Sequence, residues 1–484
     1  METQQETPPL QAGPGKRWWT LPVVSFAQLM IVLDATIVNI ALPSAQHELG
    51  MADADRHWAI TAYALAFGGL LLVGGRVCGA LGHRRSFSIG LLGFALASGL
   101  GGAADSAGLL IGARAAQGVF AALLAPAALS LVTLTFTGPR ERGRAFGVFA
   151  GVGAGGAALG VVAGGLLTQY ANWRWCLYIN VPMAALALLG TPLISRDRPS
   201  GGLGDLDVAG AVLSASGFGA LVYAFTQAEP RGWDDPPVLL LLLGGVMLLA
   251  LFAVVEAKAK QPLLPLRILL HRARGTAFAA VGLMFVSMFG FYLFISYYTQ
   301  TILGYSAFQA GLTLLINAVS AIAGSMLIAG RLHRRVAPGA LIIAGLLSAA
   351  AGMLVLTQLT IDSRHVFAAY LLPALILTGL GLGCLLASAT NLVTVDAAGP
   401  ADAGVASAAY NAVQQLGAAL GTALLNSIAL GVTASYVAAH GDRPDAVGAG
   451  TVHGYTVALW AAFAVLVLGA LAAGVLSERS TPAT

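Results

Sequence analysis

Two charged residues lie deep inside apolar stretches of the sequence, and they are the first candidates for chemistry. Asp34 lies within Leu33–Pro43, near the end of an apolar run that begins at Trp18, and Arg114 lies inside a later apolar run. A charge at the centre of a hydrocarbon layer costs about 2.5–3.5 kcal/mol on insertion-based scales, so each residue needs a partner, a proton or water. An embedded carboxylate of this kind is a candidate proton carrier.

The two residues are predicted to lie at a similar depth. At ~1.5 Å per helical residue, Asp34 lies about 13 Å and Arg114 about 9 Å from the outer end of their runs. If the two helices are neighbours, each charge offsets the desolvation of the other. One interpretation is proton coupling, in which Asp34 carries the proton and Arg114 decides when it leaves. The other is a structural salt bridge that holds two helices together.

Polar and aromatic side chains in other apolar runs predict a substrate cavity. Gln117 shares a helix face with Arg114, and Phe289 and Tyr292 share a face that becomes polar outward. Interfacial aromatic residues and hydrogen bonds between helices are the alternative explanations for such side chains. The cavity is predicted to be lined by Met30, Gln117, Phe289, Tyr292, Asn317, Asn411 and Gln414.

A conformational role is predicted for small and basic residues. Gly156, Gly160 and Gly164 recur at intervals of four and are followed by Gly165. This spacing lets helix backbones touch, either in simple packing or in a sliding, gating contact. A gating role is also assigned to Arg76, Arg84 and Arg85, which flank a short loop.

The sequence contains no pattern that predicts an enzyme, a metal site or a cofactor. The three cysteines, Cys78, Cys176 and Cys384, are far apart and form no metal-ligand or disulfide pattern. No nucleophile motif, phosphate-binding loop or dinucleotide fingerprint occurs. The predicted driving force is the proton motive force alone.

The elements that position these residues are membrane-spanning helices. The chain has 484 residues, of which 57% are hydrophobic and 10% charged, whereas soluble domains carry about 25% charged residues. Apolar runs long enough to cross a ~30 Å hydrocarbon layer recur along the chain. The predicted fold is an all-α polytopic membrane protein with fourteen spans, at residues 18–43, 57–80, 86–104, 108–134, 144–168, 175–194, 207–227, 237–257, 275–299, 308–330, 339–358, 366–392, 405–432 and 455–476.

The distribution of basic residues predicts the orientation. With both termini in the cytoplasm, nineteen of the 25 Lys and Arg residues fall on the inner side and five on the outer side. Cytoplasmic loops are enriched in Lys and Arg, so both termini are predicted to be cytoplasmic. The net charge of +4 and the lack of a basic-aromatic cluster indicate no nucleic-acid partner.

Short matches indicate an internal repeat. Gly75–Val77 matches Gly330–Leu332, and Gly156–Gly160 matches Gly417–Gly421. Spans 1–6 therefore correspond to spans 9–14, with spans 7 and 8 as an inserted pair. The predicted division is a tail and six-helix half at 1–194, the inserted pair at 195–258, and a second six-helix half at 259–484. Two related halves are typical of transporters that bind substrate between them.

The chain resembles the 14-span drug:proton antiporters of the major facilitator superfamily (the EmrB/QacA-like multidrug efflux proteins). Leu33–Pro43 resembles their span-1 signature, and Arg114–Gly118 resembles a span-4 motif whose Arg is implicated in proton transfer. Residues 173–175 (Trp-Arg-Trp) and 180–182 (Asn-Val-Pro) resemble the entry to span 6. The resemblance implies the major facilitator fold, drug:proton antiport, and proton coupling through Arg114.

Two positions depart from the family pattern. Gly79 stands where the family usually has an Asp that latches the loop between spans 2 and 3 to a neighbouring helix. Val161 stands where the antiporters have a Pro that favours a kink. The Gly79 departure removes the expected latch, and the Val161 departure keeps a proton-coupled importer or uniporter of a small metabolite open as an alternative to antiport.

The sequence therefore predicts proton-coupled efflux of amphipathic organic compounds such as antibiotics, cationic ones included. The predicted location is the cytoplasmic membrane of a bacterium, and a monomer is expected. A proton-coupled importer or uniporter is one alternative. A membrane protein that binds its ligand without transporting it is the other.

Overall fold

The computed structural model describes residues 16–478, apart from residues 52, 137, 196, 198–206, 260–261, 265–266, 268–270, 330–335, 362, 396–399 and 441–445. The described residues are mainly helical and include no β-strand. Long helices are the expected outcome of apolar runs, because in hydrocarbon a helix satisfies every backbone N–H and C=O within its own segment.

The first bundle places α1 against α5 and α4, and places α2 and α3 each against α4. Helix contacts are close where glycines replace larger side chains: a Cβ on Gly74 of α2 would stand 2.1 Å from the carbonyl oxygen of Ala122 in α4. The elements of this bundle are η1 (Lys16–Trp19), α1 (Thr20–Leu49), α2 (Asp53–Leu81), α3 (His83–Gly102), α4 (Ala107–Thr135), α5 (Pro139–Tyr170), α6 (Trp175–Tyr178), α7 (Asn180–Gly190) and η2 (Thr191–Leu193).

The second bundle repeats the neighbour pattern of the first. In it α11 packs against α16, and α12 and α14 each pack against α15. The elements are α11 (Arg272–Tyr297), α12 (Ala307–Ala323), α14 (Pro338–Leu356), α15 (Leu372–Val395), α16 (Pro400–His440) and α17 (Ala446–Glu478), with the π-helical segments η4 (Tyr298–Ile302), η5 (Gly324–Ala329) and η6 (Phe367–Leu371). Equivalent helix pairs in two bundles are what an internal repeat produces.

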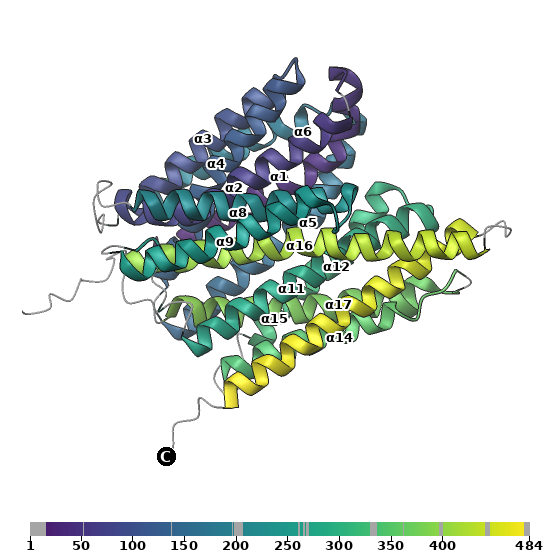
Figure 1. Cartoon of the computed structure of the whole chain (residues 1–484). Coiled ribbons are helices and arrows are strands. Elements are labelled where there is room, and N and C mark those ends of the chain that lie inside the picture. Colours follow the sequence, from purple (N-terminus) through teal and green to yellow (C-terminus); the bar gives the residue numbers. More distant parts are fainter. Residues whose placement is uncertain are drawn as a thin grey trace, which may run out of the picture.

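A helical hairpin joins the two bundles. It consists of α8 (Val208–Arg231) and α9 (Pro236–Lys258), and α8 packs against α2 of the first bundle and α16 of the second. Figure 1 shows α8 and α9 in the middle of the molecule, between the purple and blue first bundle and the green and yellow second bundle. Leu240, Leu243 and Met247 on α9 are exposed, as expected for a helix that faces lipid.

The bundles contact each other directly through α5 with α12, α2 with α16, and α4 with α16. At the last of these contacts the hydroxyls of Ser130 and Ser407 are 3.4 Å apart, and both side chains are fully buried. One hydrophobic core cluster contains residues from both bundles, such as Leu129 and Ala409. The bundles are therefore packed together along these helices.

Twelve helices within the described residues are long and apolar enough to cross a membrane, two fewer than the sequence predicts. The two predicted spans outside this set, 86–104 and 144–168, form α3 and α5. Both helices begin with basic residues and contain many glycines, which lower their hydropathy. Length and composition therefore support twelve spans, and neither the count of fourteen nor an inserted pair follows from them.

Candidate functional site

Asp34 of α1 and Arg114 of α4 form a buried ion pair. Arg114 Nη1 donates a hydrogen bond of 2.6 Å to Asp34 Oδ2, and the two side chains are 2% and 0% exposed. The structure thus brings together the two embedded charges that the sequence singles out. A buried pair recovers its desolvation cost only when the remaining donors and acceptors are also satisfied.

Two amides complete the surroundings of the Asp34 carboxylate. Asp34 Oδ1 accepts hydrogen bonds from Gln117 Nε2 at 3.0 Å and from Asn180 Nδ2 at 2.6 Å. Gln117 also accepts from Arg114 Nη1 at 2.8 Å and donates to Ser98 Oγ at 2.6 Å. All of these side chains are buried, so the carboxylate is held by donors from α4 and α7.

Arg114 is further held by α2. Its Nε donates to the carbonyl oxygen of Ala59 at 3.2 Å, and its guanidinium carbon lies 4.4 Å from the centre of the Tyr63 ring. A guanidinium over an aromatic face gains a cation–π attraction of about 2 kcal/mol when desolvated. The charge of Arg114 is therefore compensated by a carboxylate, an amide, a backbone carbonyl and a ring.

Local sequence explains how these side chains meet. Arg114 and Gln117 are three residues apart, so they lie on the same face of α4. Asn180 is the first residue of α7, and a single residue, Ile179, separates it from the short helix α6. The preceding loop is fixed to the end of α1, because Glu48 accepts from Trp173 Nε1 at 2.8 Å and from Arg174 Nη2 at 2.9 Å.

The site contains two unused polar atoms. Asn180 Oδ1 and Tyr63 Oη are buried and have no hydrogen-bond partner within the described part of the chain. Protonation of Asp34 would turn one of its oxygens from an acceptor into a donor. Asn180, which already contacts Asp34 through its amide nitrogen, carries a free acceptor that such a donor could use.

Sequence reasoning missed part of this network. The sequence alone does not distinguish Tyr63 or Ser98 from other polar residues, and Asn180 stands out only within the span-6 resemblance. The available signal for Asn180 was an amide at the edge of an apolar run. No spacing rule connects these residues to Asp34, because they lie on helices distant in the sequence.

The residues predicted to line a substrate cavity are dispersed. Tyr292 and Asn317 are joined, since Tyr292 Oη donates to Asn317 Oδ1 at 2.9 Å, and Asn317 Nδ2 donates to Thr378 Oγ1 at 2.8 Å. Asn411 donates to Ser407 O of its own helix, and Gln414 hydrogen-bonds with Tyr410.

The other predicted cavity residues lie elsewhere. Met30 is fully buried in the core, Gln117 belongs to the Asp34 network, and Phe289 is 40% exposed. The structure therefore does not bring these side chains into one site, and the predicted cavity stays a prediction.

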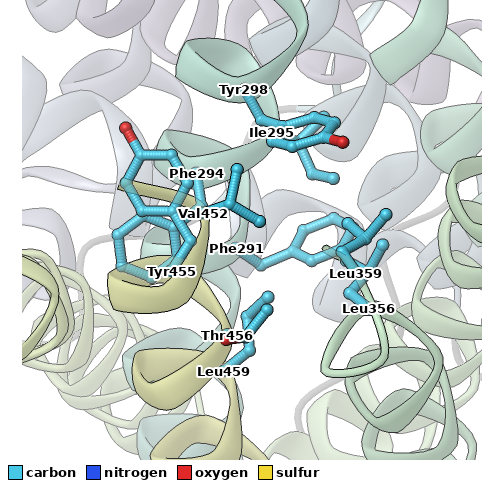
Figure 2. A pocket seen from close by; sticks show the side chains of 10 residues that line it. All are labelled: Phe291, Phe294, Ile295, Tyr298, Leu356, Leu359, Val452, Tyr455, Thr456 and Leu459. Carbon is cyan, nitrogen blue, oxygen red and sulfur yellow. The ribbon is translucent and has the colours of Figure 1, made fainter. Parts of the chain in front are cut away.

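A small pocket lies within the second bundle, on another face of α11. Figure 2 shows apolar side chains around it, including Phe291 and Ile295 of α11 and Leu459 of α17. Its free volume is about 10 Å³, which is the room that one water molecule needs. It cannot hold a drug-sized ligand in this state.

The predicted gating glycines lie between α5 and α1. A Cβ on Gly156 would stand 3.1 Å from Val32, one on Gly160 would stand 1.8 Å from Thr36 Oγ1, and one on Gly164 would stand 3.1 Å from Ile37. Gly165 follows and is partly buried. This row therefore packs α5 against the helix that carries Asp34, inside one bundle, and its gating role stays a prediction.

The predicted gating arginines lie around the α2–α3 loop. Arg76 is partly buried near the end of α2, Arg84 is partly buried, and Arg85 is exposed. Gly79, which stands where the resemblance predicts an Asp, is buried. Asp197, which follows η2, holds the start of α3 instead.

Asp197 fixes this loop through several hydrogen bonds. Its carboxylate accepts from the backbone N–H of His83 and, at 3.2 Å, from that of Arg84, and it lies 2.8 Å from His83 Nδ1. Burial raises the pKa of Asp197, but these hydrogen bonds outweigh it and bring the pKa below its usual value. The ionised carboxylate therefore stabilises the N-terminus of α3.

Comparisons with known proteins agree with this architecture. Residues 24–422 match the sequence profile of the Major Facilitator Superfamily. The chain is 53% identical over 478 residues to a puromycin resistance protein of Streptomyces alboniger, covering 99% of this chain and 95% of the relative. It is 37% identical over 410 residues to a cephamycin export protein of Amycolatopsis lactamdurans, covering 83% of each chain.

A further relative and two solved structures extend the comparison. A tetracenomycin C resistance and export protein of Streptomyces glaucescens is 33% identical over 413 residues, which cover 85% of this chain and 76% of the relative. A proton:xylose symporter shares the fold with a TM-score of 0.63 at 16% identity over 95% of each chain. A human organic anion transporter gives a TM-score of 0.60 at 16% identity, covering 94% of this chain and 100% of its own.

Proposed function

Because the chain belongs to the major facilitator superfamily, we propose that it is a multidrug-type antiporter that exports antibiotics from the bacterial cytoplasm in exchange for protons. The observation that carries the proposal is the 53% identity, over nearly the whole chain, to a puromycin resistance protein. Two more relatives are named for the export of antibiotics. Puromycin and similar amphipathic amines are therefore the first substrates to test.

The proton is assigned to Asp34. In the ionised state the carboxylate attracts Arg114 and the amides of Gln117 and Asn180. Protonation removes the charge that holds Arg114, so the contacts between α1 and α4 weaken and the bundle can rearrange. Each proton that enters contributes about 2.3 kcal/mol per 100 mV of membrane potential.

The substrate is assigned to the space between the two bundles, in a state where they have moved apart. The predicted lining residues Tyr292, Asn317 and Asn411 belong to the second bundle, and Met30 and Gln117 belong to the first. Such a site at the interface of two repeats is typical of transporters that work by alternating access. Drug binding and proton release would then occur in alternation.

The remaining assignments concern the membrane. We place both termini in the cytoplasm, since this orientation puts nineteen basic residues on the inner side. We include α3 and α5 as spans because they pack along the apolar helices α4 and α1, which gives fourteen spans with α8–α9 as the inserted pair. The halves are then 1–194 and 259–484, in a monomer powered by the proton motive force without a cofactor.

The test is puromycin-driven proton movement in proteoliposomes. Wild type is compared with Asp34→Asn and with Asp105→Asn, which changes an exposed carboxylate in the loop between α3 and α4. We expect puromycin to drive proton movement in wild type and Asp105→Asn, and no movement in Asp34→Asn.

Three other results would contradict the proposal. If Asp34→Asn transports puromycin with unchanged proton movement, Asp34 does not couple proton movement to transport. Net uptake in the direction of proton entry would indicate an importer. Binding without any transport would indicate a ligand-binding membrane protein.

A further inference from the structure

A second pair of carboxylates lies far along the chain from Asp34, at one end of the α8–α9 hairpin. Asp207 directly precedes α8, and Glu256 lies in the last turn of α9. Because α8 and α9 run in opposite directions, the start of the first and the end of the second lie together. Neither residue was singled out by the sequence, and neither takes part in the Asp34 network.

One carboxylate oxygen of Glu256 accepts a hydrogen bond, and the other does not. Its side chain is only 3% exposed although it is acidic. Oε2 accepts a hydrogen bond of 3.0 Å from the backbone N–H of Leu264, and the backbone N–H of Leu263 also stabilises the carboxylate. Oε1 is buried and forms no hydrogen bond with the described residues. An ionised carboxylate this deeply buried is costly unless all its acceptor positions are used.

Asp207 has the same arrangement. It caps the N-terminus of α8, where Oδ1 accepts from Gly210 N at 2.9 Å. Its other oxygen, Oδ2, is buried and has no partner among the described residues. Each carboxylate is thus anchored to the backbone by one oxygen and leaves the other oxygen unused.

The two unused oxygens border the same small space. A Cβ atom on Gly210 would stand 2.6 Å from Glu256 Oε1 and 2.8 Å from Asp207 Oδ2. Glycine at position 210 therefore leaves room for both oxygens to approach each other. Two carboxylates that share a buried site do not both ionise, because their charges repel at short range.

The neighbouring charges are consistent with one negative charge on the pair. The charged groups that act most strongly on Glu256 are Asp207, which repels it, and Arg76 of α2, which attracts it. Lys258, two residues further on, is exposed. With one proton on the pair, its single negative charge matches the single positive charge of Arg76.

We propose that Asp207 and Glu256 form a proton-binding site, in which one proton lies between Asp207 Oδ2 and Glu256 Oε1. The proton forms a hydrogen bond between the two carboxyl groups and satisfies both unused oxygens. The site fixes the start of α8 to the end of α9 and places the pair within electrostatic range of Arg76, near the end of α2. It is separate from Asp34 and does not depend on the proposed antiport.

The experiment measures the infrared carbonyl stretch of protonated carboxylic acids in the purified, full-length protein in lipid at neutral pH. Wild type is compared with Glu256→Gln and with Asp207→Asn, which retains the Oδ1 cap and offers an amide donor to the Glu256 carboxylate. Each substitution is expected to remove one carboxylic acid band of the same size. The second variant keeps the test decisive if the first does not fold.

Controls separate this site from Asp34. Asp34→Asn is expected to retain the band, and so is Glu48→Gln, which changes an exposed glutamate. A band that persists at full size in Glu256→Gln and Asp207→Asn would overturn the proposal. So would a wild-type band that disappears when sodium or magnesium is added at constant pH, because the pair would then hold a metal cation in place of a proton.

Discussion

At the scale of single residues, the Asp34 site owes its stability to pairing. Asp34 accepts hydrogen bonds from Arg114, Gln117 and Asn180 while fully buried. Removing one partner of a buried ion pair costs about 3–5 kcal/mol because a charge is left uncompensated, whereas neutral replacement of both partners is often nearly neutral. We therefore expect Arg114→Gln to lower the free energy of unfolding by about 3–5 kcal/mol. Asp34→Asn/Arg114→Gln is expected to recover most of that loss.

The measurement is unfolding in detergent micelles of both single variants and the double variant. Arg231→Gln is the matched control, because Arg231 is 52% exposed and its pair with Asp235, at 3.9 Å, is a surface pair of the kind that contributes at most about 1 kcal/mol. A double variant no more stable than Arg114→Gln would show that the pair is not what stabilises this region.

Only some residues of the Asp34 site could be predicted from the sequence. Asp34 and Arg114 could be found because embedded charges are rare, and Gln117 could be found because it lies three residues from Arg114 on one helix face. Tyr63, Ser98 and Asn180 could not be connected to them. Their positions depend on how α2, α3 and α7 pack around α4, and a periodic pattern within one helix carries no information about its neighbours.

At the scale of elements, α5 carries two rows of glycines with the same spacing. Gly156, Gly160 and Gly164 face α1, whereas Gly151 faces Ile322 of α12 in the second bundle, with Gly147 one turn before it. Spacing alone predicts that a helix backbone comes close, but it cannot say which neighbour does so. The row noticed in the sequence is the one that packs inside a bundle, and the row between bundles was missed.

Gly160 offers a direct test of the α1–α5 contact. A Cβ there would stand 1.8 Å from Thr36 Oγ1 and 2.9 Å from the carbonyl oxygen of Leu33, the residue before Asp34. Gly160→Ala is expected to push α5 away from α1, to lower stability by about 1–3 kcal/mol, and to reduce puromycin transport.

The control for this substitution is Gly112→Ala on α4, where nothing lies within 4 Å of the added Cβ. Thermal unfolding and transport in proteoliposomes are measured for both variants. Equal stability and equal transport in the two variants would mean that the α1–α5 contact tolerates an extra methyl group. The backbones of α1 and α5 would then not need to approach closely at Gly160.

At the scale of the whole molecule, the two bundles are packed against each other through α5 with α12, α2 with α16 and α4 with α16, and the pocket described in the second bundle is too small for a drug. The pocket in the second bundle has about 10 Å³ of free volume. Two predicted lining residues, Tyr292 and Asn317, form a hydrogen bond with each other. Transport by a site between the bundles therefore requires them to separate, and the contact between α4 and α16 has to open.

A reversible cross-link tests whether that separation occurs. The hydroxyls of Ser130 in α4 and Ser407 in α16 are 3.4 Å apart, close enough for cysteines at these positions to form a disulfide. The native cysteines, Cys78, Cys176 and Cys384, are free, so they are replaced by alanine in this experiment, which leaves the two introduced thiols as the only pair that can be oxidised. Oxidised Ser130→Cys/Ser407→Cys is expected to lose puromycin transport, and reduction is expected to restore it. Each single cysteine variant should keep transporting under oxidation, and full activity of the cross-linked protein would mean that these two helices stay together throughout the transport cycle.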